Sequence, residues 1–158
     1  MIFCTIGNDR HKFPRFIKII EEINDFYNDD IFLQHGYSLP PKEGIISCQF
    51  LKREKFENKI QQAKYIISHG GAGTIAYCLQ NKKIPIVIPR LKKYNEHLDN
   101  HQLDIASHFA KEGLCIVEHN ADRIIKLLKE KELTIKFSLQ SRKKEFFESL
   151  RSDLLNLL

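Results

Sequence analysis

The chain has 158 residues and a formal net charge of +5 at pH 7, from 25 Lys and Arg against 20 Asp and Glu. This length suits one domain with a sizeable core rather than two, so we expect residues 1–158 to form a single domain. The mild basic excess favours an anionic ligand or surface. No basic run interleaves with aromatic residues, which argues against nucleic-acid binding.

In chain order, short apolar runs alternate with stretches of helical periodicity. The runs predict strands at 1–6, 31–35, 45–50, 65–68, 86–88 and 114–117. Helices are predicted at 13–27, at 53–63, from the turn at 69–74 to before Pro85, through Ala110, at 121–131 and at 138–158. Because the strands are continuously apolar, they indicate an α/β fold with a Rossmann-like parallel sheet and helices on both faces. Ligands of such a fold gather at the carboxyl ends of the strands.

The four cysteines, Cys4, Cys48, Cys78 and Cys115, are widely spaced, form no CxxC pair and lie in apolar stretches. This predicts buried free thiols and fits a reducing cytoplasm better than a disulfide framework or a zinc ribbon. The first apolar run is too short for a signal peptide, and no stretch approaches the ~20 apolar residues of a membrane span. We therefore expect a cytoplasmic protein that something else would hold at a membrane.

The turn at residues 69–74, His-Gly-Gly-Ala-Gly-Thr, lies between a predicted strand and a predicted helix. Glycines let a backbone approach another molecule closely, and the first amides of a helix favour an anion such as phosphate. The pattern predicts a phosphate site beside His69. The alternative is that the glycines only let the helix pack closely on the sheet.

Two known glycine motifs can be tested on this turn. Gly71-x-Gly73-x-x-Ala76 satisfies the dinucleotide pattern, but that pattern normally follows the first strand. An acidic residue should also close the next strand, where this chain has Pro89-Arg90. An NAD(P)-linked oxidoreductase is therefore the third choice of function. No G-K-S/T follows the glycines, which excludes a Walker A loop.

A second polar segment covers residues 94–102, where eight of nine side chains can form hydrogen bonds. Such density suits recognition of a sugar, whose hydroxyl groups need many oriented polar partners. Two alternatives stay open. Asn95 or Asp99 could cap a helix, or His97 and His101 could bind a metal with Asp104 as third ligand.

Residues 67–74, 85–90 and 95–102 carry motifs that, together and in this order, resemble the glycosyltransferase family 28 C-terminal domain. This family includes soluble subunits of split bacterial polysaccharide glycosyltransferases and Alg13-like proteins, and it is similar to the carboxyl half of MurG. The resemblance covers the chain from Met1 through Ala106. It implies half of a GT-B enzyme, the half that binds a UDP-sugar donor.

The resemblance also implies roles for individual residues. Relatives carry a glutamate after the glycine turn that reaches the ribose, where this chain has Tyr77-Cys78-Leu79, so Glu96 becomes the ribose candidate. The implied diphosphate site is Gly7, Asn8, His69, Gly70, Gly71, Ala72, Gly73, Thr74 and Arg90. Phe50, Leu51 and Glu96 would meet the uridine, and Asn100, His101 and Gln102 the donor sugar.

The implied reaction is inverting transfer of a hexose or N-acetylhexosamine to a lipid-linked glycan in capsule or exopolysaccharide biosynthesis. No metal or other cofactor is expected. His69 would stabilise the leaving group, while a membrane-anchored partner subunit would bind the acceptor and supply the general base. The apolar stripe of the last helix, 137–158, would help dock that partner. The alternative function is a nucleotide-sugar-binding or scaffolding module without turnover.

Overall fold

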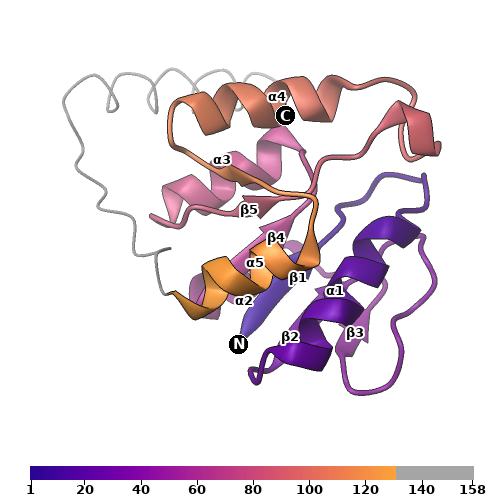
Figure 1. Cartoon of the computed structure of the whole chain (residues 1–158), viewed down its shortest axis with the longest axis vertical. Coiled ribbons are helices and arrows are strands. Elements are labelled where there is room, and N and C mark those ends of the chain that lie inside the picture. The colour runs from indigo at the N-terminus through magenta and orange to yellow at the C-terminus, as the bar shows by residue number, and fades with distance from the viewer. Residues whose placement is uncertain (131–158) are drawn as a thin grey trace.

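Within residues 1–130, six parallel strands form one sheet in the order β3-β2-β1-β4-β5-β6 (Figure 1). The structure, a computed structural model, describes residues 1–130. The helix expected at 137–158 and its docking role lie outside the described residues. The strands are β1 (Ile2–Thr5), β2 (Ile31–Gln34), β3 (Ile46–Cys48), β4 (Tyr65–Ser68), β5 (Ile86–Val87) and β6 (Ile116–Val117). The Rossmann-like α/β fold predicted from the sequence is confirmed.

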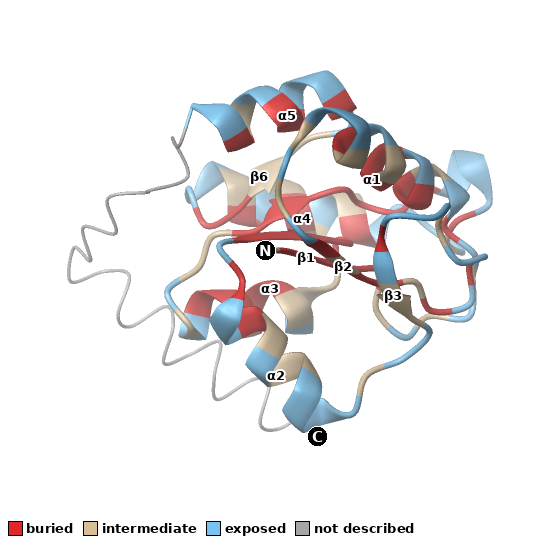
Figure 2. Cartoon of the chain, turned by 90° about the horizontal axis from the view of Figure 1, so that it is seen from below, coloured by how far each residue is buried: buried red, intermediate tan, exposed pale blue. Residues whose placement is uncertain are grey.

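Helices cover both faces of the sheet, as Figure 2 shows. On one face, α1 (Pro14–Phe26) packs beside α5 (Ala121–Lys129) over the alternate strand residues Ile2, Cys4 and Ile67. The other face is covered by α2 (Arg53–Gln62), α3 (Ala72–Gln80) and α4 (His101–Lys111). A short 3-10 turn, η1 (Lys92–Tyr94), precedes α4. The expected two-sided burial of the strands is thus observed.

The helix boundaries follow from local chemistry. Pro14 occupies the first turn of α1, where its missing N–H costs no helical hydrogen bond. The Asn120 side chain accepts from the Arg123 amide and so caps α5. Three of the predicted thiols, Cys4, Cys78 and Cys115, are buried, whereas Cys48 on the edge strand β3 is only half-buried.

The strand order reverses at the centre of the sheet, between β1 and β4. Both neighbours of β1 run parallel to it, with Thr5 opposite Gln34 on one side and Ser68 on the other. The connections that leave β1 and β4 therefore diverge to opposite faces and leave a crevice at their carboxyl ends, the usual ligand position in this architecture. The residues at that crevice are Gly7 after β1 and the glycine turn after β4.

Candidate functional site

The chain turns from β4 into α3 through Gly70 and Gly71. Gly71 is the N-cap residue, and no side chain accepts a hydrogen bond from the first turn of the helix. The amides of Ala72, Gly73 and Thr74 therefore begin α3 at the positive end of its dipole, without a side-chain cap. Such a helix start is suited to an anion.

Internal neighbours explain three of the four glycines around this turn. A Cβ on Gly7, whose φ is +72°, would lie 2.5 Å from His69 Cε1, and a Cβ on Gly71 would meet His69 Nε2. A Cβ on Gly70 would lie 2.6 Å from the Gln102 carbonyl oxygen. A Cβ on Gly73 would meet nothing within 4 Å. Close packing, the alternative reading of the turn, thus accounts for Gly7, Gly70 and Gly71, and Gly73 faces open space.

His69 is enclosed between the two glycine backbones and is 8% exposed. Burial, helped by the positive charge of Arg90, lowers the pKa of His69 to about 4. The imidazole is therefore neutral at neutral pH, with one nitrogen able to donate and the other able to accept. Its Nδ1 is buried and has no hydrogen-bond partner. The functional feature of this turn is therefore the uncapped helix start with the neutral imidazole beside it.

A cavity of about 450 Å³ opens in front of this turn. Its wall joins the ends of β1, β2 and β4 to the first turns of α2 and α3. The lining residues are Gly7, Asn8, Gln34, Leu51, Arg53, Phe56, His69, Gly71, Gly73 and Thr74. The structure therefore brings together six of the nine residues predicted for the diphosphate, and Leu51 of those predicted for uridine. Gly70 and Ala72 flank the cavity within the same turn.

Three lining residues had escaped the sequence interpretation. Gln34 ends β2 and donates through Nε2 to Asn8 Oδ1 at 3.0 Å, which fixes the Asn8 side chain. Phe56 and Arg53 lie on the first turn of α2, and the Arg53 side chain pairs with Glu57 at 2.8 Å and is 83% exposed. Arg53 is the only charged residue among the described residues that line the cavity. Its position after a predicted strand was the signal that could have identified it.

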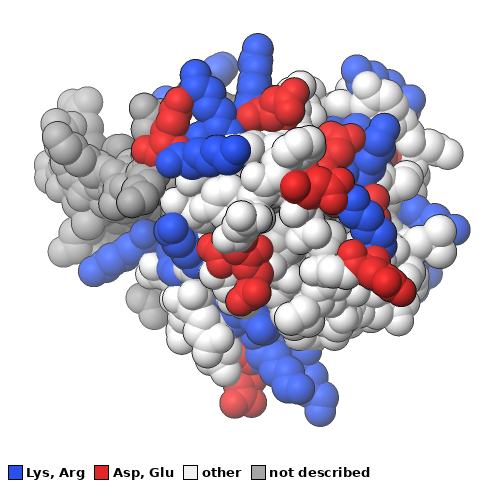
Figure 3. Space-filling view, turned by 60° about the horizontal axis from the view of Figure 1, so that its bottom comes forward, with Lys and Arg blue, Asp and Glu red and all other residues white. Residues whose placement is uncertain are grey.

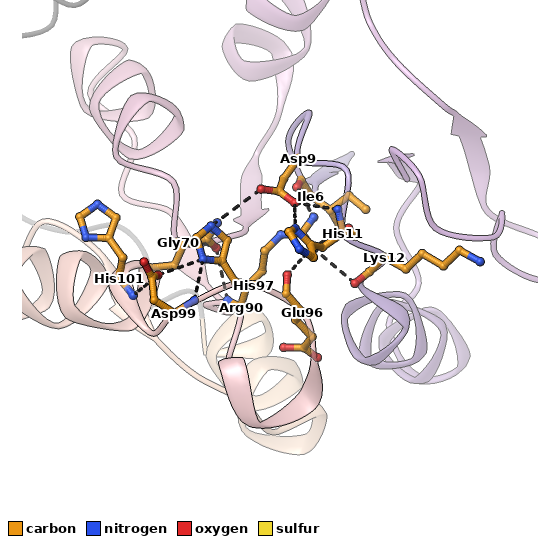
Figure 4. A network of polar contacts seen from close by, with 11 residues as sticks. Ile6, Asp9, His11, Lys12, Gly70, Arg90, Glu96, His97, Asp99 and His101 are labelled. Carbon is orange, nitrogen blue, oxygen red and sulfur yellow. Dashed lines mark hydrogen bonds and ion pairs between the residues drawn. The ribbon is translucent and has the colours of Figure 1, made fainter.

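Arg90 does not face the cavity, which corrects its predicted role. The side chain is fully buried, and its guanidinium donates to the carbonyl oxygens of Ile6 (3.0 Å), His11 (2.8 Å) and Glu96 (3.1 Å), as the close view in Figure 4 shows. Arg90 therefore ties the loop after β1 to the segment after β5. Its influence on the site is indirect, through the pKa of His69.

Glu96 belongs to the same internal network and is 1% exposed. Its carboxylate accepts from Arg15 Nε at 2.9 Å and Nη2 at 2.7 Å, and from the Leu91 amide at 3.0 Å. With these partners the carboxylate has no access to a ribose, so its predicted uridine role is also corrected. Phe50, the other predicted uridine residue outside the cavity, is 40% exposed and contacts the Tyr37 ring.

The three residues predicted for the donor sugar lie at the start of α4. Gln102 is 7% exposed, and its Oε1 accepts from the Gly70 amide at 3.2 Å and from the Arg90 amide at 3.3 Å. This side chain therefore holds the start of α4 against the glycine turn. Asn100 accepts from the Lys92 amide at 3.0 Å, and His101 is exposed. None of the three lines the 450 Å³ cavity.

The aspartate and histidine side chains near α4 contact one another in successive pairs and do not form a metal site. Asp99 Oδ1 accepts from the His101 amide at 2.9 Å and lies 2.9 Å from His97 Nδ1 (Figure 4). The N-cap residue of α4 is Asn100, so neither Asn95 nor Asp99 caps this helix. His97 Nε2 lies 3.8 Å from Asp9, which in turn contacts His11 at 2.7 Å. Among residues 1–130, no three such side chains are arranged to hold a metal ion.

A parallel sheet of this order, with an open helix start at its switch point, defines the Rossmann-like class of ligand-binding α/β domain. Solved glycosyltransferases share this fold: CalG4, the calicheamicin glycosyltransferase, matches with a TM-score of 0.60 over 98% of this chain and 38% of its own, at 13% identity. Acinetobacter baumannii MurG matches with a TM-score of 0.53 over 81% of this chain and 40% of its own, at 15% identity.

The family is established by the sequence profile of the glycosyltransferase family 28 C-terminal domain, which matches residues 2–158. This chain belongs to that family. The UDP-N-acetylglucosamine transferase subunit ALG13 of Candida albicans is 46% identical over 97 residues, which are 61% of this chain and 31% of that protein. Its Yarrowia lipolytica counterpart is 30% identical over 105 residues, 65% of this chain and 49% of that protein. The chain thus spans half or less of these relatives.

The glycine turn follows β4 rather than β1, unlike the first-strand position of a dinucleotide fingerprint.

Within the part of the chain that the structure describes, no helix is both long and apolar enough to cross a bilayer.

Proposed function

We propose that this chain is the donor-binding half of a two-component, inverting glycosyltransferase that uses a UDP-sugar. The observation that carries the proposal is the uncapped start of α3, which lies beside His69 in the wall of a cavity. A diphosphate supplies the acceptor oxygens that the helix amides lack. Family membership gives the reaction class.

The proposed donor carries an N-acetylhexosamine, in keeping with the UDP-N-acetylglucosamine named in both curated relatives. We place the diphosphate against Gly73 and Thr74 and the uracil beside Leu51, which lines the same cavity. The sugar then extends toward Asn100 and His101, at the exposed start of α4. Arg53 at the mouth of the cavity replaces Arg90 as the cationic partner of the phosphates.

In the proposed reaction an acceptor hydroxyl attacks the anomeric carbon from the face opposite the UDP. The new C–O bond forms as the bond to the β-phosphate oxygen breaks, and UDP leaves with the electron pair. The amides at the start of α3 and the neutral His69 imidazole donate hydrogen bonds to the oxygen that gains charge. One such donor contributes ~3 kcal/mol of transition-state stabilisation. We expect this chemistry to proceed without a metal ion.

A partner subunit completes the proposed enzyme. The chain contributes one Rossmann-like sheet, whereas its similarity to CalG4 covers 38% of that transferase. The partner, anchored in the cytoplasmic face of a membrane, binds a lipid-linked glycan acceptor and supplies the base that removes the hydroxyl proton. Both ALG13 relatives are named as subunits, which supports a divided enzyme.

Calorimetric titration of the chain with UDP, UDP-GlcNAc, UDP-glucose, UDP-galactose and NADH tests the donor site. We expect uridine nucleotides to bind in EDTA as they do in magnesium, UDP-GlcNAc to bind more tightly than the hexose donors, and NADH not to bind. The proposal is refuted if no uridine ligand binds, either to the chain alone or to the chain co-expressed with its proposed membrane-anchored partner.

A substitution at Gly73 separates binding from folding. Gly73→Asp puts a carboxylate in open space at the first turn of α3, where an acidic residue stabilises the helix. We expect the variant to be at least as stable as the wild type and to lose UDP binding by more than about tenfold, because the carboxylate repels the diphosphate. Gln80→Asp adds the same charge at the exposed far end of α3 and should keep wild-type affinity.

A further inference from the structure

A second hollow, of about 580 Å³, lies between α2 and the edge strand β3. We call it the lateral groove. Its lining residues come from β2, β3, the β3–α2 loop and one side of α2: Phe32, Ser47, Cys48, Phe50, Leu51, Lys52, Lys55, Asn58, Lys59 and Gln62. Only Leu51 also lines the donor cavity. The lateral groove is otherwise separate from the site described above.

The groove exists because α2 covers the centre of the sheet and leaves its edge open. The buried residues of α2 and its end, Ile60 and Ala63, pack on Phe3 and Ile66 of the central strands. On the edge strand, Ile46 is paired in register with Phe32 and so lies on the same face as α2. Ile46 is nevertheless 63% exposed. An apolar strip of the sheet is thus left without a covering helix.

Positive charge lines the other wall of the groove. Lys52, Lys55 and Lys59 follow each other at helical spacing, and none of the described lining residues is acidic. The ion pair within α2 joins Arg53 to Glu57 and leaves these lysines out. Lys59 Nζ lies 3.9 Å from the centre of the Phe32 ring, so even the innermost ammonium contacts an aromatic face.

We propose that the lateral groove docks this domain on an anionic phospholipid surface. Exposed apolar side chains beside lysines are the combination that an interfacial bilayer region accepts, with phosphate headgroups against the ammonium groups and the apolar groups inserted below them. The inserting residues are Phe50, which lines the groove, and Ile46, which lies beside it on β3, at 40% and 63% exposure. Lysine stems of this length reach the headgroups while lying along the apolar floor.

Two features favour a lipid over a macromolecular ligand. The edge strand β3 has only three residues, which offers few backbone groups for an added peptide strand. Acidic and basic side chains are interspersed over the face seen in Figure 3, unlike the continuous basic face that nucleic acid requires. The lysines of the groove coincide with exposed apolar surface.

The docking has a consequence for the donor site, although it does not depend on the proposed function. Leu51 lies in the walls of both hollows. A bilayer against the lateral groove therefore lies directly beside the donor cavity. A lipid-linked substrate would then meet the bound nucleotide without leaving the membrane surface.

Flotation of the full chain with phosphatidylcholine vesicles, with and without phosphatidylglycerol, tests the docking. A lysine near an anionic surface strengthens binding roughly fivefold, so Lys55→Gln with Lys59→Gln should weaken partitioning roughly 25-fold. The matched control, Lys18→Gln with Lys126→Gln, removes the same charge from exposed residues on the opposite face and should lose little. Ile46→Ser should weaken partitioning without any change in charge.

The proposal is overturned if the wild type does not bind phosphatidylglycerol vesicles, or if both lysine pairs lose binding equally, which would indicate net charge alone. It is also overturned if a free acidic peptide binds the groove and vesicles do not. Thermal unfolding verifies that each variant is folded. UDP titration of the same variants keeps this test independent of the donor site, because none of the substituted residues lines the donor cavity.

Discussion

The pKa of His69 makes the free energy of unfolding depend on pH in a way that one substitution should remove. Burial lowers this pKa from its ordinary value of 6.5 to about 4 in the folded protein. Between these two values the unfolded chain binds a proton that the folded protein excludes. Stability therefore falls as the pH falls through this window, and below about pH 4 the full penalty applies.

The size of the effect follows from the two pKa values. Between about pH 7 and about pH 5, the difference in proton binding lowers the free energy of unfolding by about 2 kcal/mol. Urea unfolding followed by circular dichroism at both pH values measures it. In His69→Gln the side chain cannot be protonated, so the pH dependence should shrink by about 2 kcal/mol relative to the wild type.

The comparison of His69→Gln with the wild type isolates the contribution of His69, because all other titrating groups are common to both proteins. Equal pH dependence in His69→Gln and the wild type would show that the pKa of His69 is the same in the folded protein as in the unfolded chain. The argument that burial keeps this imidazole neutral would then be refuted.

Three further substitutions test the packing and charge assignments. Gly71→Ala forces a methyl group onto the enclosed His69 ring and should cost about 1–3 kcal/mol in a thermal or urea unfolding assay; wild-type stability would refute the packing role. Arg53→Ala changes an exposed side chain, so stability should be unchanged while UDP affinity, measured by calorimetry, falls about tenfold. Unchanged affinity would show that Arg53 is not the cationic partner of the phosphates. Glu96→Gln leaves the Arg15 guanidinium without its carboxylate partner and should cost about 3 kcal/mol of stability, with little effect on UDP binding per folded molecule. Loss of UDP binding in a stable Glu96→Gln variant would restore its predicted uridine role.

Periodicity was sufficient to predict the sheet and the turn. The apolar run at Tyr65–Ser68 is a strand with the predicted bounds, because a strand buried on both faces admits no polar alternation. The weakest elements were the short strands Ile86–Val87 and Ile116–Val117, which are shorter than their apolar runs. Residues such as Ile88 and Leu114 are buried although they lie beyond the ends of these strands. The buried apolar run is therefore longer than the segment that pairs in the sheet.

The roles of polar residues were harder to predict, because a motif gives their place along the chain but not the direction of their side chains. Arg90 follows a strand end, where a phosphate ligand is expected, yet it points inward to three carbonyl oxygens from different segments. Glu96 lies in a polar loop, yet it meets Arg15, which is 81 residues distant. Only tertiary structure identifies such partners. Arg53 was missed for the converse reason: on sequence it resembles any solvated helix residue.

These corrections change how the proposed site handles charge. His69 is neutral, and the Arg90 guanidinium is bound to backbone carbonyls, so no buried cation faces the cavity among its described lining residues. A leaving diphosphate would be met by fixed dipoles at the start of α3 and by one exposed cation, Arg53, at the rim. Fixed dipoles stabilise charge as it develops without reorganising. An exposed arginine adds affinity and also allows UDP to depart, which a buried cation in its place would oppose.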